Sequence, residues 1–183
     1  AGLFGKIAGS LSAAGLNILS AQIFTRSDGI VLDSFFVNDA RTGNLAAREQ
    51  HDMFAGLLER VLNGEVVDLS ALIARQITNR PVYQPYAGER MPTEIQFDND
   101  AAETRTLIEI ETEDQLGLLY AISQTFSELE VDIDGARIVT ERGAAIDSFY
   151  VRELDGGKIV LPERQKFIEA SLRNAISQFV AVP

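Results

Sequence analysis

The sequence predicts an α+β protein built from two copies of a βαββαβ unit, each an antiparallel sheet with two helices on one face. One observation is an alternating apolar run at 107–111 that leads through a glycine turn into helical apolar spacing. The other is an internal repeat with an offset of 115 residues, which aligns Gly2 with Gly117. The repeat continues without a gap through the first strand of a predicted hairpin. We therefore expect two ferredoxin-like units with the same order of elements.

Equivalent positions of the repeat share their chemistry. The matched pairs are Gly2–Gly117, Leu3–Leu118, Ile7–Ile122, Ser12–Ser127, Ile18–Ile133, Ala21–Ala136, Ile23–Ile138 and Thr25–Thr140. After a one-residue slip in the hairpin, Asp33-Ser34-Phe35 aligns with Asp147-Ser148-Phe149. One such match carries little information, but two ordered copies are a strong indication of duplication.

Composition excludes several classes of function. Of the 183 residues, 46% are apolar and 23% are charged, which is ordinary for a globular protein with a packed core. The net charge of −11 argues against a nucleic-acid partner or an anionic membrane surface, because both need Lys and Arg. No apolar run approaches the ~20 residues of a membrane helix. The absence of cysteine excludes disulfides and thiolate catalysis, and fits a reducing compartment.

The first copy begins directly with a helix. Its expected elements are a helix from Leu3 to a stop at Gly15, strands at 17–25 and 30–37 joined by the Asp28-Gly29 turn, a helix capped by Asn44 and closed by Asn63-Gly64, and a short helix capped by Asp68. This short helix lies in an insertion at 65–92, which continues after it as a proline-rich segment with Pro81, Pro85 and Pro92. A strand is expected at 93–97.

The second copy repeats this order. We expect strands at 106–111, 131–140 and 145–151, a helix at 117–129, a turn at Arg142-Gly143, a helix beginning near Pro162 and a short last strand at 179–182. The domains expected are therefore 1–100, with the insertion, and 104–183. Because the first copy has no strand before its glycine, we expect this unit to lack its N-terminal strand and the chain to be a fragment. The loss should leave the strand at 30–37 with an open edge.

The turn at 114–117 is the best candidate for a binding site. Unpaired N–H groups at a helix start attract a carboxylate, and Asn17 or Asp132 at a strand start could meet an amino group. The competing interpretation is that Gly117 only makes a tight corner, and spacing alone favours this one because helix starts are commoner than ligand sites.

The other polar residues favour structural roles. Asp33 and Asp147 lie mid-strand, where a buried carboxylate needs partners, so a hydrogen bond at a junction or sheet edge is expected. His51, the only histidine, is expected to face solvent, as are the acidic side chains Glu109, Glu111, Glu113, Asp114, Glu128 and Glu130. No nucleophile–base pair, metal motif or phosphate-binding loop occurs, so we expect no catalytic residues, metal or cofactor.

The repeat resembles tandem ACT domains, with greatest similarity to the C-terminal regulatory repeats of the bacterial PII uridylyltransferase family. The stretches that carry the resemblance are 2–4 with 16–18, 33–37, 114–119 with 131–133, 146–151 with 156–159, and the insertion with the strand at 93–98. In that family the turn usually reads Asp-Arg-Pro-Gly-Leu-Leu, whereas Gln115 and Leu116 stand here in place of Arg and Pro.

The resemblance implies a cytoplasmic amino-acid sensor, with glutamine as the ligand, that controls catalytic domains upstream in the same chain and could form a homodimer. The alternative is an interaction module that binds no ligand. The implied binding residues are Asp114, Gln115, Leu116, Gly117, Leu118, Asp132, Ile133, Gly2, Leu3, Asn17 and Ile18. We expect the ligand between the 114–118 turn and Asp132-Ile133, at a junction with another unit. The N–H groups of Gly117 and Leu118 should hold its carboxylate, and Asp132 or Asp114 its ammonium.

Overall fold

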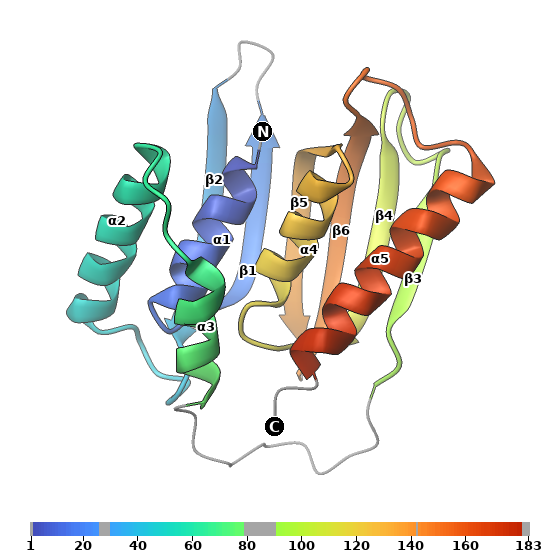
Figure 1. Cartoon of the computed structure of the whole chain (residues 1–183). Helices are drawn as coiled ribbons and strands as arrows, with labels where there is room; N and C mark the ends of the chain where they lie inside the picture. Colours follow the sequence, from blue (N-terminus) through green and yellow to red (C-terminus); the bar gives the residue numbers. More distant parts are fainter. Residues whose placement is uncertain (1, 26–29, 79–90, 142, 181–183) are drawn as a thin grey trace.

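The computed structural model describes residues 2–25, 30–78, 91–141 and 143–180. These residues form one antiparallel sheet of six strands in the order β2-β1-β5-β6-β4-β3, with five helices (Figure 1). The strands are β1 (Leu16–Thr25), β2 (Val31–Asp39), β3 (Glu94–Asp98), β4 (Thr106–Glu113), β5 (Val131–Glu141) and β6 (Ala144–Glu153). The helices are α1 (Leu3–Ala13), α2 (Arg48–Leu62), α3 (Leu69–Thr78), α4 (Leu118–Glu128) and α5 (Pro162–Val180). The predicted turn at Asp28-Gly29 lies outside the described residues.

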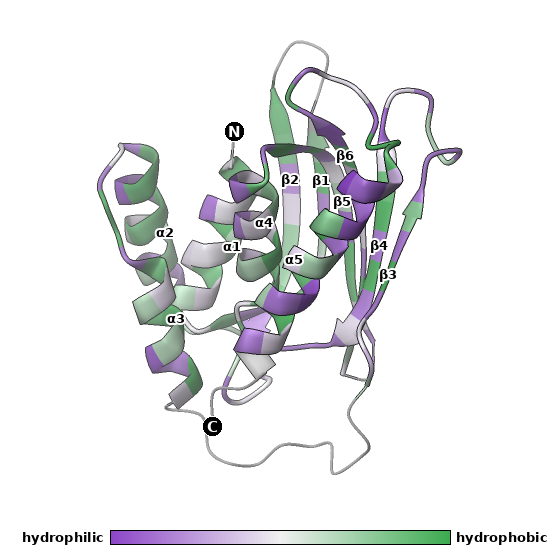
Figure 2. Ribbon diagram, turned by 45° about the vertical axis from the view of Figure 1, so that its right-hand side comes forward, coloured by the Kyte–Doolittle hydropathy of each residue, from purple (hydrophilic) through white to green (hydrophobic). Residues whose placement is uncertain are grey.

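The helices all cover the same face of the sheet, as the sequence predicts (Figure 1). In β4 the side chains alternate between buried and exposed, so that Ile108 and Ile110 face the helices while Glu109 and Glu111 face away. Figure 2 shows hydrophilic and hydrophobic segments alternating along α5, the pattern of a helix that buries one side. The mixed α+β class is therefore confirmed.

The larger of two hydrophobic clusters joins the two halves of the repeat. Phe4 of α1 packs against Phe35 of β2 and Phe149 of β6, with ring centroids 6.4 Å and 6.2 Å apart. Phe126 of α4 meets the same Phe149 at 5.4 Å in an edge-to-face arrangement. Ile122 is fully buried, so the predicted core face of α4 is confirmed.

The junction between the halves is the pairing of β1 with β5. Ala21 pairs with Ile138, and Ile23 pairs with Ala136. In the repeat Ala21 is equivalent to Ala136 and Ile23 to Ile138, so exchanging the two copies turns one pair into the other. The register is therefore symmetric about one central pair, Gln22 and Arg137. An antiparallel pairing of equivalent strands relates the two copies by an approximate twofold axis, with α1 beside α4 (Figure 1).

The helices α1 and α4 approach each other closely because α1 has a glycine at the contact. A Cβ atom built at Gly9 would lie 2.6 Å from the ring of Tyr120 in α4 and 2.9 Å from Leu69 in α3. Real Cβ atoms do not make contacts this short, so a side chain at this position would push the helices apart.

Two strands form the edges of the sheet. β2 pairs only with β1 among the described strands, so the expected open edge of this strand is present. At the other edge β3 pairs with β4. The predicted last strand at 179–182 is wrong at its start, because α5 continues to Val180. The helical spacing of Ile168, Leu172 and Ile176, all buried, carries α5 onward, and β3 already occupies the position beside β4.

One helix start also differs from the prediction. Asn44 is not the N-cap of α2, which begins at Arg48 with Ala47 before it. Gln50 takes over the capping role, because its side chain accepts a hydrogen bond from the Ala47 N–H at 2.9 Å and donates one to the Gly15 carbonyl at 3.0 Å. The helix is thereby attached to the C-terminal end of α1.

Candidate functional site

The turn between β4 and α4 forms one wall of the site. Gly117 has φ 88°, a left-handed conformation that costs a glycine little and any other residue more. The Asp114 N–H donates to the Gly143 carbonyl at 2.8 Å, which fixes the start of the turn. The Leu118 N–H donates to the Gln115 carbonyl at 3.0 Å, so it is already engaged within the turn. The expectation that Leu118 offers a free N–H to a ligand carboxylate is therefore wrong.

The opposite wall comes from the other half of the repeat. Asn17, at the start of β1, donates from Nδ2 to Oδ2 of Asp114 at 3.3 Å. Ile18 follows it, and the Thr140 hydroxyl of β5 donates to the Ile18 carbonyl at 3.4 Å. The glycine turn of the second copy thus meets the strand start of the first copy.

Asp132 and Ile133 lie elsewhere, so the expected pairing of these residues with the 114–118 turn is wrong. α4 has 11 residues and carries the chain along about 16 Å between the turn and the start of β5. The strand start that belongs to the same copy is therefore at the far end of the sheet. The strand start that meets the turn is that of the other copy, where Asn17 takes the position equivalent to Asp132.

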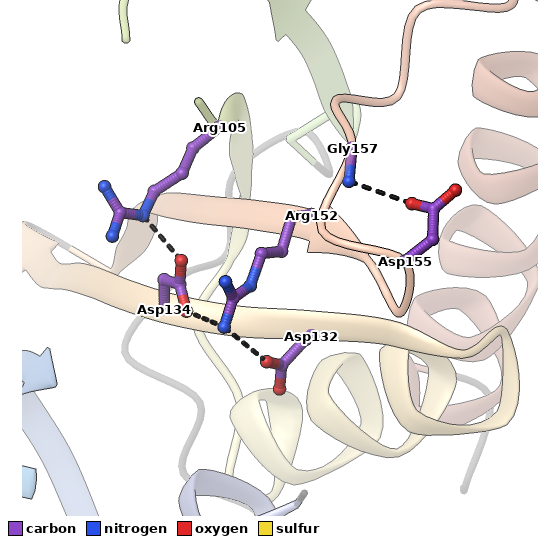
Figure 3. Close-up of polar contacts among 6 residues, drawn as sticks. All are labelled: Arg105, Asp132, Asp134, Arg152, Asp155 and Gly157. Atoms are coloured by element: carbon purple, nitrogen blue, oxygen red, sulfur yellow. Dashed lines mark hydrogen bonds and ion pairs between the residues drawn. The ribbon is translucent and has the colours of Figure 1, made fainter. Parts of the chain in front are cut away.

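Asp132 instead belongs to a chain of ion pairs (Figure 3). The Arg152 guanidinium lies 3.3 Å from Asp132 Oδ2 and 3.0 Å from Asp134 Oδ1. Arg105 Nε contacts Asp134 Oδ2 at 2.6 Å. These contacts neutralise Asp132, so its carboxylate already has the cation that the prediction sought in a ligand.

Gly2 and Leu3 start α1 as Gly117 and Leu118 start α4. Gly2 has φ 76°, and a Cβ built there would be 4.0 Å from the Ser127 hydroxyl at the end of α4. Ser127 is the repeat equivalent of Ser12, which lines the wall beside Gly117. Each glycine turn therefore faces the C-terminal end of the other copy's helix.

Asp147 lies at the base of the site and is the most unusual residue in it. Its side chain on β6 is 1% exposed, and neither carboxyl oxygen accepts a hydrogen bond of normal geometry from the described part of the chain. Burial raises the pKa of Asp147 well above its usual value, the charge of Asp114 raises it further, and the Val139 N–H lowers it in part. Of the partners expected for a mid-strand aspartate, the described chain offers the Val139 N–H, which does not reach normal hydrogen-bond geometry.

The equivalent aspartate of the first copy is less enclosed. Asp33 is half-buried on the edge strand β2, and its Oδ1 also has no hydrogen-bond partner among the described residues. Burial raises its pKa, and the N–H of Phe24 opposes this. The two aspartates therefore share a position but differ in how far they are removed from water.

The space among these groups is small. The cavity lined by the turn, Asn17 and Asp147 measures about 10 Å³, room for a single water molecule. Its wall contains Ser12, Asn17, Ile18, Asp114, Gln115, Gly117, Leu118, Leu119, Ile138, Thr140, Ala145 and Asp147. Sites for small molecules usually measure about 300–1,000 Å³, so this one is closed.

A second cavity of about 340 Å³ lies next to the turn, with Leu116 in its wall. It opens between the end of α1 and the start of α2, and its polar wall residues are Asp39, Arg41, Glu49, Gln50 and Gln76. Leu116 itself is 2% exposed, so it belongs to the packing between the cavities and offers a ligand little surface.

Sequence analysis did not single out Ser12 and Thr140 as wall residues of the site. The repeat alignment was the available signal, because it matches both residues with a hydroxyl side chain in the other copy. Among the remaining candidates, His51, Glu109, Glu111, Glu128 and Glu130 are exposed as expected. Within the described ranges, no group of three potential ligands could hold a metal, and no helix has the length and apolarity to cross a membrane.

The sequence of the site and its surroundings matches a known family. Residues 94–183 match the family model of an ACR9-like, ACT-like domain. No solved structure matches the chain significantly. The family match covers β3 to α5, and so includes the 114–118 turn and Asp147.

Curated relatives match nearly the whole chain. A bifunctional uridylyltransferase/uridylyl-removing enzyme of Rhodospirillum rubrum is 36% identical over 179 residues, 98% of this chain and 19% of the relative. Enzymes of the same name from Azospirillum brasilense and Ruegeria pomeroyi are 35% and 33% identical, over 96% and 97% of this chain and 19% of each relative. The chain spans about a fifth of the length of these relatives. Residues 94–183 thus match an ACT-like domain, and the chain is similar along nearly its whole length to a part of the bifunctional uridylyltransferase/uridylyl-removing enzymes.

Proposed function

We propose that the chain is the amino-acid-sensing regulatory module of a uridylyltransferase, that its ligand is glutamine, and that it controls catalytic domains of the same protein. The observation that carries this proposal is the contact of Asn17 with Asp114. This hydrogen bond joins a helix-start turn of one copy to a strand start of the other. A ligand placed between them would change how the two copies sit, which is what a regulatory site requires.

The proposal includes two ACT units, which the sequence divides at 1–100 and 104–183. The symmetric β1–β5 register supports two equivalent copies that share one sheet. The pairing of β3 with β4 favours counting residues 94–98 with the second unit, where they take the position of a fourth strand.

Binding requires the closed cavity to open, because about 10 Å³ cannot hold an amino acid. The Asn17–Asp114 hydrogen bond at 3.3 Å is long and partly exposed, so it is a weak closure. We propose that the ligand displaces this bond and moves the 114–118 turn away from β1. The ligand's carboxylate would then meet the helix start and its ammonium the acidic base of the site.

Calorimetry of the chain with glutamine, glutamate and other amino acids tests the proposal. In this proposal the Asn17 amide, once released from Asp114, bonds to the ligand, so Asn17→Ala should weaken glutamine binding about 5- to 10-fold, the usual effect of one lost polar contact. Asn44→Ala, in the exposed loop before α2, is the matched control and should bind as the wild type does. If no amino acid binds the wild type, the chain is an interaction module, the alternative reading of the repeat.

A further inference from the structure

We infer that the cavity of about 340 Å³ at the end of α1 is a second binding site, and that its ligand is a zwitterion of amino-acid size. Arg41 binds the carboxylate of this ligand, and Glu49 binds its ammonium group. The inference goes beyond the proposed function, because this cavity is separate from the one beside Asn17 and Asp147. Binding here does not require the turn at 114–118 to move.

The first argument is the size of the cavity. Its volume of about 340 Å³ lies within the range of about 300–1,000 Å³ that is usual for small-molecule sites, whereas the cavity beside Asp147 measures about 10 Å³. The wall comes from the end of α1, the loop after β2, the first two turns of α2, the last turn of α3 and Leu116. A ligand therefore finds a space that the fold already provides.

The second argument is that two glutamine side chains give the wall fixed polar groups. Gln50 Nε2 donates to the Gly15 carbonyl at 3.0 Å, and Gln76 Nε2 donates to the Ala13 carbonyl at 3.1 Å. A Cβ atom built at Gly15 would lie 3.2 Å from Gln76 Oε1 and 3.4 Å from Gln50 Nε2, so the glycine leaves the room in which the two amides approach each other. Each amide nitrogen carries a second N–H, which is held in place before a ligand arrives.

The third argument is the state of the charged groups in the wall. Neither the Arg41 guanidinium nor the Glu49 carboxylate makes a hydrogen bond or an ion pair in the part of the chain that the structure describes. The third charged residue, Asp39, is already engaged. Its Oδ1 accepts from the Arg41 N–H at 2.9 Å, and from the N–H and the hydroxyl of Thr42 at 2.7 Å and 3.0 Å. These bonds fix the backbone of Arg41 beside the cavity.

The unpaired charges select the class of ligand. A molecule with a carboxylate alone would leave Glu49 unpaired, and a molecule with an ammonium group alone would leave Arg41 unpaired. A zwitterion satisfies both, because a guanidinium pairs with a carboxylate through two parallel hydrogen bonds and the Glu49 carboxylate accepts from an ammonium group. The apolar wall residues Ala14, Ala47 and Met53 suit the carbon chain of such a ligand.

Titration calorimetry with three related probes tests the class of ligand. The probes are glutamine, 4-carbamoylbutanoate, which lacks the ammonium group, and 4-aminobutanamide, which lacks the carboxylate. The wild type should bind glutamine at least 5-fold more tightly than either analogue, because each analogue leaves one charge of the wall unpaired. Equal binding of all three probes overturns the inference.

Two substitutions test whether these residues form the site. Arg41→Gln and Glu49→Gln should each weaken glutamine binding in this cavity about 5- to 10-fold. Both side chains are exposed, so the variants are expected to fold, and circular dichroism verifies this. The matched controls are Arg75→Gln in α3 and Glu59→Gln in α2, which remove exposed charges outside the wall and should bind as the wild type does.

Nuclear magnetic resonance identifies the cavity directly. The side-chain amide signals of Gln50 and Gln76 should shift when glutamine is added to the wild type, because both amides lie in the wall. Unchanged signals at saturating glutamine overturn the inference.

The variants also separate this inference from the proposed function. Loss of binding in Asn17→Ala, with Arg41→Gln and Glu49→Gln binding as the wild type does, overturns the inference alone. Loss of binding in the two cavity variants, with Asn17→Ala unaffected, supports the inference and places the ligand away from the site of the proposed function. Partial loss in both sets of variants supports both sites. Absence of binding by any amino acid to the wild type overturns both.

Discussion

Asp147 makes the stability of the free protein depend on pH. Its pKa in the folded state is raised above the 3.8 of an unfolded chain, chiefly by burial. Between these two values the unfolded chain binds fewer protons at this residue than the folded one, so the contribution of Asp147 to stability is full below about pH 4 and is lost as the pH rises through the folded pKa. Each unit of separation removes about 1.4 kcal/mol of unfolding free energy.

Asp147→Asn should abolish this loss. The test is urea denaturation of the wild type and the variant across a series of pH values, compared as a difference in unfolding free energy. The difference should grow in favour of the variant as the pH rises from 4 and then level off. A difference that stays constant with pH would contradict a buried, proton-binding Asp147, and Glu109→Gln supplies the exposed control.

At the residue scale, the sequence predicted the residues at helix and strand starts better than it predicted the contacts between them. The turn, Asn17 and Asp132 were all correct as helix or strand starts, but Asp132 was paired with the wrong turn. Sequence spacing does not show the antiparallel pairing of β1 with β5 that brings Asn17 to Asp114. It also does not show whether a mid-strand aspartate finds a partner, so Asp147 was expected to be structural.

At the scale of the helices, Gly9 sets the distance between α1, α3 and α4. Gly9→Ala should destabilise the fold by about 1–3 kcal/mol, because the added methyl would overlap with Tyr120 and Leu69 unless the helices separate. Gly56→Ala is the control: it lies in the middle of α2 with open space around it, and should stabilise by about 0.5–1 kcal/mol. Denaturant midpoints measure both, and a neutral Gly9→Ala would show that these helices can shift freely.

Arg164 joins three elements at the end of the sheet away from the turn. It binds both carboxylate oxygens of Glu153, the last residue of β6, at 2.8 Å, and donates to the Leu129 carbonyl at the end of α4 at 2.6 Å. Arg164→Lys keeps the charge but cannot reproduce this forked geometry. We expect a loss of about 1–2 kcal/mol of unfolding free energy.

Arg48→Lys is the comparison for this variant. Arg48 pairs with Asp52 at 3.8 Å on the exposed side of α2, where such pairs contribute little. Chemical denaturation should show a change below about 0.5 kcal/mol for this variant. Equal effects of the two substitutions would mean that the contacts of Arg164 do not hold α5 against the sheet.

The extent of the elements themselves followed from the sequence wherever apolar periodicity was long. The prediction failed at helix ends that depend on residues outside the helix. The start of α2 is decided by Gln50 reaching Gly15, and the end of α5 by the presence of β3 beside β4. Local spacing does not show either effect, because Gly15 lies far from Gln50 in the chain and β3 lies far from α5.

At the scale of the whole molecule, the repeat predicted two units and the structure shows one sheet and a larger hydrophobic cluster that spans both copies. Phe4 of the first copy lies in the same cluster as Ile168 and Leu172 of the second. The β1–β5 ladder adds main-chain hydrogen bonds across the junction. Removal of a side chain from the first copy should therefore weaken the second copy as well, since cooperative units share their contacts.

Phe4→Ala tests this coupling. Phe4 is 6% exposed and its ring contacts those of Phe35 and Phe149, so truncation should cost about 3–5 kcal/mol through lost burial and the cavity left behind. Leu45→Ala, at a residue 93% exposed, should have almost no effect.

In the wild type and both variants, circular dichroism during urea unfolding should show a single transition. Hydrogen exchange in α5, which Phe4 does not belong to, should accelerate in Phe4→Ala as much as exchange in α1 does. Two separate transitions, with α5 protected as in the wild type, would show instead that the copies fold independently and that a ligand between them would act on their arrangement alone.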